Sequence, residues 1–196
     1  METKGQIRER LKQKRNSLTS CQAMGKSDKI CREIRGLPWF LQAETICFYY
    51  PIGKEVDLLP LAKEALALGR DVAFPRVEGK EMEFYQVDSL DGFAEGSFHV
   101  MEPAAGTPMA KPGMLVLVPG VGFARDGSRM GYGGGYYDRY FARHRDCLKI
   151  GVAYSFQLVE GLEPEAHDIP MDGVVTEKGV LEFWLQKRNW GVSSRN

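Results

Sequence analysis

Glycine is dense in one stretch of this 196-residue chain, residues 119–141, which reads PGVGFARDGSRMGYGGGYYDRYF. An apolar, β-forming run (114–118) precedes it, and a polar Asp126-Gly127 turn interrupts it. Four glycines then follow at close spacing: Gly131, Gly133, Gly134 and Gly135. Glycine loses more backbone freedom on folding than any other residue, so this density does not serve stability. It lets backbone N–H groups approach a bulky group, and a helix is expected directly afterwards.

A glycine loop that leads into a helix offers unpaired N–H donors and the positive end of the helix dipole, so the expected guest is a phosphate. The loop is not a Walker A sequence, because no Gly-Lys-Ser/Thr follows it. It is also a poor dinucleotide fingerprint, because roughly a dozen residues separate the strand from the glycines. The alternative is a tight glycine turn that contacts no ligand.

Asp138 is expected in the first turn of the following helix. An acidic residue there often only compensates the helix dipole. A carboxylate beside a bound polyphosphate would be repelled, however, unless a divalent cation lay between them, and Mg²⁺ is typically held by one or two carboxylates together with substrate phosphates. The pattern therefore favours a magnesium nucleotide.

Residues 118–140, with a PGVGF opening and a GSRMGYGGGYYDR core, closely resemble the 5-formyltetrahydrofolate cyclo-ligase family, also called 5,10-methenyltetrahydrofolate synthetase. The resemblance implies an enzyme with ATP as co-substrate and Mg²⁺ as metal. It implies cyclisation of 5-formyltetrahydrofolate to 5,10-methenyltetrahydrofolate, with release of ADP and phosphate, through a phosphorylated formyl (imidate) intermediate. It also implies a Rossmann-like sheet on which the nucleotide and the folate, polyglutamylated or not, meet above the carboxyl edge.

The same resemblance assigns site residues. It implies a catalytic role for Arg129, Tyr136 and Asp138. Contacts to ATP are expected from the N-terminal helix and the glycine loop: Lys4, Arg8, Arg129, Met130, Gly131, Tyr132, Gly133, Gly134, Gly135, Tyr136 and Tyr137. Contacts to the folate are expected from that loop and from four other segments: Glu55, Asp57, Pro75, Arg76, Glu102, Tyr132, Gly133, Gly134, Gly135, Tyr136, Tyr154 and Gln157. The metal is expected on Asp138 and Asp168, with Asp172 as the alternative to Asp168.

The residues themselves leave alternatives open for the charged candidates. Lys4 and Arg8 are one helical turn apart, which also suits a solvated charged face, and Arg15 further along is not assigned. Glu55 and Asp57 follow a strand end, where open α/β sheets bind ligands. The other interpretations are a solvated loop carboxylate for Glu55 and a helix N-cap for Asp57.

Two further points concern binding. Pro75-Arg76 is expected at a strand end, where the guanidinium would pair with a folate glutamate or a phosphate, or else form a surface ion pair of little energetic value. Several family members carry a basic residue where this chain has Tyr132 or Gly134. The phosphate charge must then be met by backbone N–H groups, Arg129, Lys4 and Arg8.

Helix-like and strand-like patterns alternate along the chain and predict the elements that position these residues. Helices are expected over 3–18, 19–35, 57–69 and 136–144, and strands over 45–50, 71–77, 81–87, 114–118, 148–154 and 173–176. The alternation predicts a three-layer α/β/α domain with a Rossmann-like, largely parallel sheet of CoA transferase-like topology and right-handed crossovers. One domain is expected over 1–186, followed by a polar tail over 187–196. Residues 88–112 form a long segment with few periodic signals.

Composition excludes several classes of protein. Lys plus Arg and Asp plus Glu both total 26, and no basic stripe recommends a nucleic-acid surface. No apolar run approaches the roughly 20 residues that a membrane span needs. Four cysteines without a CxxC pair, and a charged N-terminus, predict a reduced cytoplasmic protein. We expect a monomer.

Two other functions stay open on the sequence. One is a non-catalytic nucleotide-binding or regulatory module, in which the glycine loop holds ATP without a folate pocket. The other is a sugar-phosphate or CoA-handling enzyme of similar topology. A zinc site and a serine hydrolase are not supported, because the histidines lack companions at metal-ligand spacing and no serine has an evident histidine partner.

Overall fold

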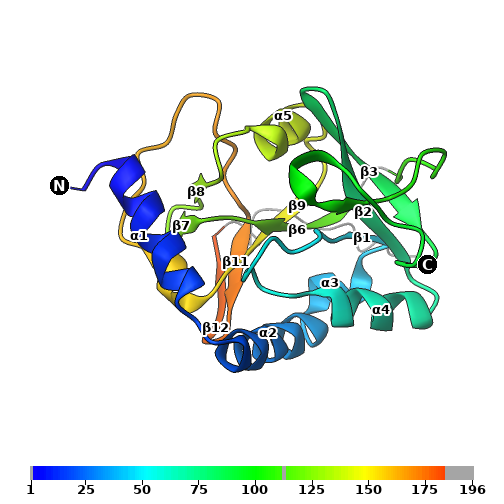
Figure 1. Ribbon diagram of the computed structural model, residues 1–196, viewed down its shortest axis with the longest axis horizontal. Coiled ribbons are helices and arrows are strands. Elements are labelled where there is room, and N and C mark those ends of the chain that lie inside the picture. Colours follow the sequence, from blue (N-terminus) through cyan, green and yellow to red (C-terminus); the bar gives the residue numbers. More distant parts are fainter. Residues whose placement is uncertain (1, 112–113, 184–196) are drawn as a thin grey trace, which may run out of the picture.

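The computed structural model describes residues 2–111 and 114–183, and there the predicted three-layer arrangement is confirmed (Figure 1). A seven-stranded sheet forms the middle layer, in the order β12-β11-β9-β6-β1-β2-β3. Its strands are β1 (Thr45–Cys47), β2 (Asp71–Glu78), β3 (Glu81–Val87), β6 (Leu115–Pro119), β9 (Leu148–Val152), β11 (Gly173–Thr176) and β12 (Gly179–Glu182). The five inner strands are parallel, and only the edge strands β3 and β12 pair antiparallel.

Helices α2 (Ser20–Arg35), α3 (Pro38–Gln42) and α4 (Leu59–Ala67) lie on one face of this sheet, and α5 (Tyr136–Arg143) lies on the other (Figure 1). Helix α1 (Lys4–Asn16) instead lies against a small sheet made of β7 (Gly122–Ala124), β8 (Arg129–Met130) and β10 (Leu158–Val159). Leu11 of α1 packs there with Val121, Ala124 and Met130. This packing holds α1 beside the glycine loop, which directly follows β8.

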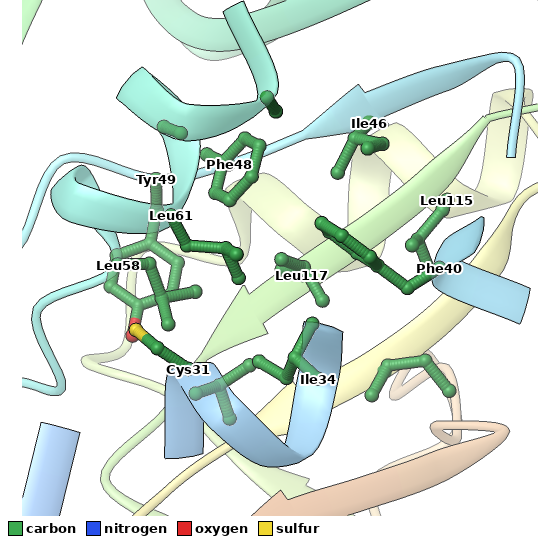
Figure 2. Close-up of a cluster of buried hydrophobic side chains, with 14 of the residues drawn as sticks. Cys31, Ile34, Phe40, Ile46, Phe48, Tyr49, Leu58, Leu61, Leu115 and Leu117 are labelled. Carbon is green, nitrogen blue, oxygen red and sulfur yellow. The ribbon is translucent and has the colours of Figure 1, made fainter. Parts of the chain in front are cut away.

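Side chains of the parallel strands alternate between two cores, because successive residues of a strand point to opposite faces. Ile46 and Leu117 enter the core under α2, α3 and α4, whereas Cys47 and Val116 enter the core under α5. Figure 2 shows part of the first core, where three helices and two strands meet: Ile34, Phe40, Leu61, Ile46 and Leu117. Burial on both faces accounts for the unbroken apolar runs in the sequence.

Helix starts follow local capping chemistry, with one correction. Thr19 caps α2 as predicted: its Oγ1 accepts the Gln22 N–H at 3.2 Å, and Gln22 accepts the Thr19 N–H at 2.9 Å. At α4 the N-cap is Leu58, so the interpretation of Asp57 as N-cap is wrong. The Asp57 carboxylate lies one residue earlier and accepts the Leu59 N–H at 2.9 Å.

The end of α4 was predicted at Gly69, and this is confirmed. Gly69 has a φ of +70°. Its N–H donates to the Leu66 carbonyl, and the N–H of Arg70 donates to the Ala65 carbonyl. Leu68 is 71% exposed, because it lies at the C-cap where the chain leaves the core. The strand after α3 is shorter than expected, covering 45–47 of the predicted 45–50.

Pro75-Arg76 was expected at the end of a strand, and the structure corrects this. β2 continues to Glu78, and Pro75 and Arg76 pair in register with Phe84 and Glu83 of the antiparallel strand β3. The proline therefore lies in mid-strand without ending the ladder.

The predicted long segment 88–112 contains a two-stranded hairpin, β4 (Ala94–Glu95) with β5 (Met101–Glu102), around a 3₁₀ turn at Ser97–His99. Another 3₁₀ turn, Ser155–Gln157, follows β9. The polar tail predicted over 187–196 lies outside the described residues. Within the described chain, no helix combines the length and apolar character needed to span a bilayer.

The strand order reverses at β1, since the chain steps from β1 to β2 on one side and later builds β6, β9 and β11 on the other. Open α/β sheets form their ligand crevice at such a switch point, outside the carboxyl ends of the two diverging strands. In this fold the relevant ends are those of β1 and β6.

Candidate active site

A cavity of about 560 Å³ lies at this switch point. Tyr49 and Tyr50, which follow β1, and Pro119, which ends β6, line it. The size is that of a small-molecule site. The cavity brings together many of the predicted site residues: Lys4, Arg8, Glu55, Pro75, Glu102, Arg129, Met130, Gly131, Tyr132, Gly133, Gly134, Gly135, Tyr136, Tyr137, Asp138 and Asp168.

The glycine loop, residues 131–135, forms one wall. Within the described chain, none of its five backbone N–H groups donates a hydrogen bond. Gly133 and Gly135 have φ values of +104° and +64°, which side chains rarely adopt, and Gly135 is the N-cap of α5. Unpaired donors at a helix start make an anion-binding surface.

Two cations of α1 reach this wall. The Lys4 ammonium lies 2.9 Å from Glu165 Oε1 and 3.4 Å from Asp168 Oδ2, and Arg8 Nε donates to the Gly131 carbonyl at 3.3 Å. Both side chains line the cavity. The one-turn spacing thus places two positive charges beside the unpaired amides.

A third cation, Arg129, is buried beneath the loop. Its Nη2 donates to Asp138 Oδ2 at 2.8 Å, and its Nε has no hydrogen-bond partner among the described residues. A Cβ on Gly131 would lie 2.8 Å from Arg129 Nη1, so a larger residue at this position would have to displace the guanidinium. A buried guanidinium with an unmet donor suits a site that receives an anion.

Asp138 and Asp168 are linked through one short segment. Asp138 Oδ1 accepts the N–H of Ile169 at 3.2 Å, so the carboxylate of the neighbouring Asp168 is drawn to the same cavity. Burial would raise the pKa of Asp168, but the Glu165 N–H and Lys4 outweigh it and hold this pKa below its usual range. Two carboxylates that line one cavity together with unpaired backbone amides of the described chain offer the oxygen donors that Mg²⁺ prefers, so these residues fit the metal.

Glu55 is a buried carboxylate at the cavity wall. Its Oε2 accepts the Ile52 N–H at 2.8 Å, and its Oε1 accepts Arg15 Nη1 at 3.4 Å and the hydroxyl of Tyr132. Burial raises the pKa of Glu55, while Tyr132, Ile52 and Arg15 each act to lower it. The Tyr132 side chain is therefore engaged with Glu55.

The remaining cavity wall is apolar, with one more carboxylate. Val77 and Met82, which pair across β2 and β3, and Val100 from the hairpin segment line it. Glu102 lies beside them, 7% exposed, and accepts the Val77 N–H at 3.3 Å; burial raises the pKa of this carboxyl group. An apolar wall with a few fixed acceptors suits a flat heterocycle that carries N–H groups.

Sequence reasoning missed ten lining residues: Tyr49, Tyr50, Ile52, Val77, Met82, Ser97, Val100, Pro119, Glu165 and His167. The sequence pattern could have indicated three of them. Tyr49 and Tyr50 directly follow the strand that ends at the switch point, and Val77 lies two residues after Pro75, on the same face of its strand. Met82 and Val100 enter through strand pairing and loop folding, which local sequence does not report.

Asp57 and Arg76 do not line the cavity, contrary to expectation. Asp57 is exposed at the start of α4. Arg76 lies on the face of β2 opposite Pro75, where its guanidinium pairs with Glu78, donates to the Ala104 carbonyl at 2.9 Å and stacks 3.8 Å from the Tyr85 ring centroid. Strand alternation separates the two adjacent residues.

Tyr154 and Gln157 also lie outside this cavity, behind its wall. Gln157 is buried and donates to the carbonyls of Gly120 and Val121 at 2.8 and 3.0 Å, and its Oε1 accepts the Tyr154 N–H. The Tyr154 hydroxyl donates to the backbone carbonyl of Glu55 at 3.3 Å. These two residues hold the segments that build the site rather than facing a ligand.

Asp172, the alternative metal residue, is buried elsewhere. Its Oδ2 lies 2.8 Å from the Lys149 ammonium and accepts the Lys149 backbone N–H at 2.8 Å. It joins β9 to the loop before β11, so of the two aspartates only Asp168 faces the cavity.

A family model for 5-formyltetrahydrofolate cyclo-ligases matches residues 1–177 of the chain. The chain belongs to this family. The cyclo-ligase of Escherichia coli K12 is 27% identical over 182 residues, which cover 88% of this chain and 100% of that protein. The mitochondrial cyclo-ligase of Arabidopsis thaliana is 26% identical over 184 residues, covering 79% of this chain, which spans 66% of the length of that longer relative.

A solved structure agrees with this cyclo-ligase family membership. The NMR structure of Aquifex aeolicus 5,10-methenyltetrahydrofolate synthetase has a TM-score of 0.83 and 36% identity, covering 98% of this chain and 99% of that chain. The resemblance inferred from the glycine motif and the fold class are both confirmed.

Proposed function

We propose that this protein catalyses the ATP- and Mg²⁺-dependent cyclisation of 5-formyltetrahydrofolate to 5,10-methenyltetrahydrofolate, with release of ADP and phosphate. The observation that carries the proposal is the row of five unpaired N–H groups at residues 131–135. It shares one cavity with two cations of α1, the carboxylates of Asp138 and Asp168, and an apolar wall. Membership of the cyclo-ligase family indicates which reaction this geometry serves.

At the phosphate end, the loop amides and α1 would hold the polyphosphate. Backbone donors and the start of α5 are fixed by the fold, so they need no reorganisation when charge develops. Lys4 and Arg8 add the positive charge that residues 131–135 lack, since none of these five residues is Lys or Arg. Asp138 and Asp168 would hold Mg²⁺, which when bound neutralises polyphosphate charge.

At the folate end, the apolar wall would hold the reduced pterin. Tyr49, Met82 and Val100 offer flat, largely apolar surface, and Glu55 and Glu102 offer acceptors for N–H groups of the ring. The cavity then places the formyl group next to the loop that holds the phosphates. Such positioning is the main contribution that a protein makes to phosphoryl transfer.

The proposed steps balance without a protein nucleophile. A formamide oxygen is a poor leaving group, so its attack on the γ-phosphorus converts it into a phosphorylated imidate and releases ADP. The N10 amine then attacks the formyl carbon and loses its proton, and the C–O bond breaks as phosphate leaves. The amides of 131–135 and Arg129 face the oxygens on which negative charge accumulates.

We also propose that the enzyme is a monomer of the reducing cytoplasm. Its four cysteines are all free: Cys21 is exposed, whereas Cys31, Cys47 and Cys147 are buried, and burial raises the pKa of the Cys31 thiol to about 11. Buried thiols of this kind resist oxidation. Light scattering of the purified protein tests the assembly state.

The decisive experiment supplies 5-formyltetrahydrofolate, ATP and Mg²⁺ and follows the absorbance of the methenyl product, with ADP and phosphate measured in parallel. We expect one ADP and one phosphate per product and no reaction without ATP. 5-Methyltetrahydrofolate, which has no formyl oxygen, is the matched negative substrate. Nucleotide binding without methenyl formation would favour the regulatory module, and the absence of both would remove the proposal.

Gly133→Ala is expected to weaken nucleotide binding. The φ of +104° costs alanine about 1–3 kcal/mol, a factor of roughly 5 to 150 in Kd, and no atom lies within 4 Å of the added Cβ, so the effect is backbone strain alone. Calorimetry with a non-hydrolysable ATP analogue measures it. Gly69→Ala, at a similarly open site with φ +70° beyond α4, is the matched control and should lower stability without changing this Kd.

A further inference from the structure

Helix α1 buries an arginine that the proposed chemistry does not use. Its buried side chains are Leu11 and Arg15, and only 7% of the Arg15 side chain is exposed. Arg15 does not line the cavity but lies behind Glu55, against Gly120 and Gln157. A buried guanidinium is costly unless it is paired, so its partners indicate what it does.

Those partners come from two segments far apart in the sequence. Arg15 Nη1 lies 3.4 Å from Glu55 Oε1, and the guanidinium carbon lies 5.5 Å from the centroid of the Tyr132 ring. Tyr132 in turn donates its hydroxyl to the same Oε1 of Glu55. Arg15, Glu55 and Tyr132 therefore form a closed set of three mutual contacts.

We propose that Arg15 and Tyr132 are positioning residues, which hold the Glu55 carboxylate at the folate end of the cavity and tie the glycine loop to it. The inference rests on the proposed function, because it takes Glu55 as a folate acceptor. Glu55 faces the cavity, while the backbone N–H of Tyr132 belongs to the row of unpaired donors. The Tyr132 side chain thus connects the two substrate ends, and Arg15 supplies the charge that stabilises this connection.

Other groups around Glu55 do not replace Arg15. The phenols of Tyr49, Tyr137 and Tyr154 lie near it, but burial raises the pKa of each, so they are neutral in the working range. The Ile52 N–H is a neutral donor. Among the described residues, Arg15 is the cation paired with Glu55. Its removal leaves a buried carboxylate with neutral donors only.

The test uses Arg15→Gln, Arg15→Lys and Tyr132→Phe in the full chain. Arg10→Gln is the control, since Arg10 is an exposed arginine of the same helix whose ion-pair partner among the described residues is Glu2. The Glu55 carboxyl is titrated by NMR with ¹³C-labelled glutamate, assigned by Glu55→Gln. This measurement needs no activity, so it separates failure of this inference from failure of the proposed cyclisation.

Losing an opposite charge at this distance is expected to raise the Glu55 pKa by about 1 to 3 units in Arg15→Gln. The acid limb of kcat/KM for 5-formyltetrahydrofolate should move up in pH by the same amount. Tyr132→Phe, which removes one donor at a half-exposed ring, should move the Glu55 pKa and the acid limb in the same direction by less. Arg15→Lys should keep both close to their wild-type values. Arg10→Gln should change neither.

An unchanged Glu55 titration in both Arg15→Gln and Tyr132→Phe would overturn the proposal, even if Arg15→Gln lowered the melting temperature. The proposal would also be overturned if Arg15→Lys gave the same Glu55 pKa as Arg15→Gln, because a lysine supplies the positive charge that the proposal requires. If Arg15→Gln failed to fold, Tyr132→Phe alone would decide in the same way.

Discussion

Asp138→Asn is expected to lower kcat/KM for cyclisation on the order of a thousandfold while the fold stays intact. Charge stabilisation by a bound metal contributes several kcal/mol, and each 1.36 kcal/mol is a factor of ten, so losing about 4 kcal/mol gives this size. The Asn side chain keeps one acceptor oxygen, which can serve Arg129 Nη2 or the Ile169 N–H but not both, because these two donors bond to different oxygens of the carboxylate. The change therefore removes negative charge and also weakens the buried ion pair with Arg129, so the kinetics are recorded at low temperature, where the variant is folded.

Two measurements check this expectation. Steady-state kinetics give kcat/KM, and calorimetry gives the Mg²⁺ dependence of nucleotide binding, which should be much weaker in the variant. Asp146→Asn, at an exposed aspartate shortly after α5, is the matched control and should behave like the wild type. An Asp138→Asn enzyme with kcat/KM within about threefold of the wild type would contradict the assigned role.

Asp172→Ala is expected to show the opposite pattern, with a large loss of stability and unchanged kinetic constants. The carboxylate and the Lys149 ammonium are 2.8 Å apart, and both side chains are less than 10% exposed. Removing one partner of a buried ion pair typically costs about 3–5 kcal/mol, because the other charge stays buried without compensation. Urea unfolding measures the free energy, and substrate kinetics are recorded at low temperature where the variant is folded.

The matched comparison is Asp168→Asn, the other aspartate of the same loop. Asp168 faces the cavity, so its loss should impair nucleotide binding and turnover while stability changes little. The double variant Lys149→Met/Asp172→Leu should recover a large part of the stability, because apolar residues can replace a buried ion pair at little cost. Impaired kinetics in a folded Asp172→Ala enzyme would indicate that Asp172 acts in the active site.

The sequence alone determined those features that depend on neighbours in the chain. The glycine loop, the helix start after it and Asp138 in the first turn of α5 are all present as predicted, because they depend on backbone conformation and helix polarity. The capping box at Thr19 and the end of α4 at Gly69 follow for the same reason. Unbroken apolar runs likewise indicated strands that are covered on both faces.

Tertiary structure alone decided which of two close candidates faces the cavity. Glu55 is turned inward by Arg15 and the Ile52 N–H, while Asp57 is held by the start of α4. Pro75 faces the cavity while Arg76 faces away, because β2 runs on past both residues and its side chains alternate.

The same holds for the two aspartates before β11. Asp172 is taken by a lysine of a neighbouring strand, which leaves Asp168 at the cavity. The partners of the buried Arg15 guanidinium are also set by the tertiary structure, which places α1 beside Glu55 and Tyr132. Such pairings join residues tens of positions apart, and the free energy that selects them comes from burial and charge compensation, which a local pattern does not record.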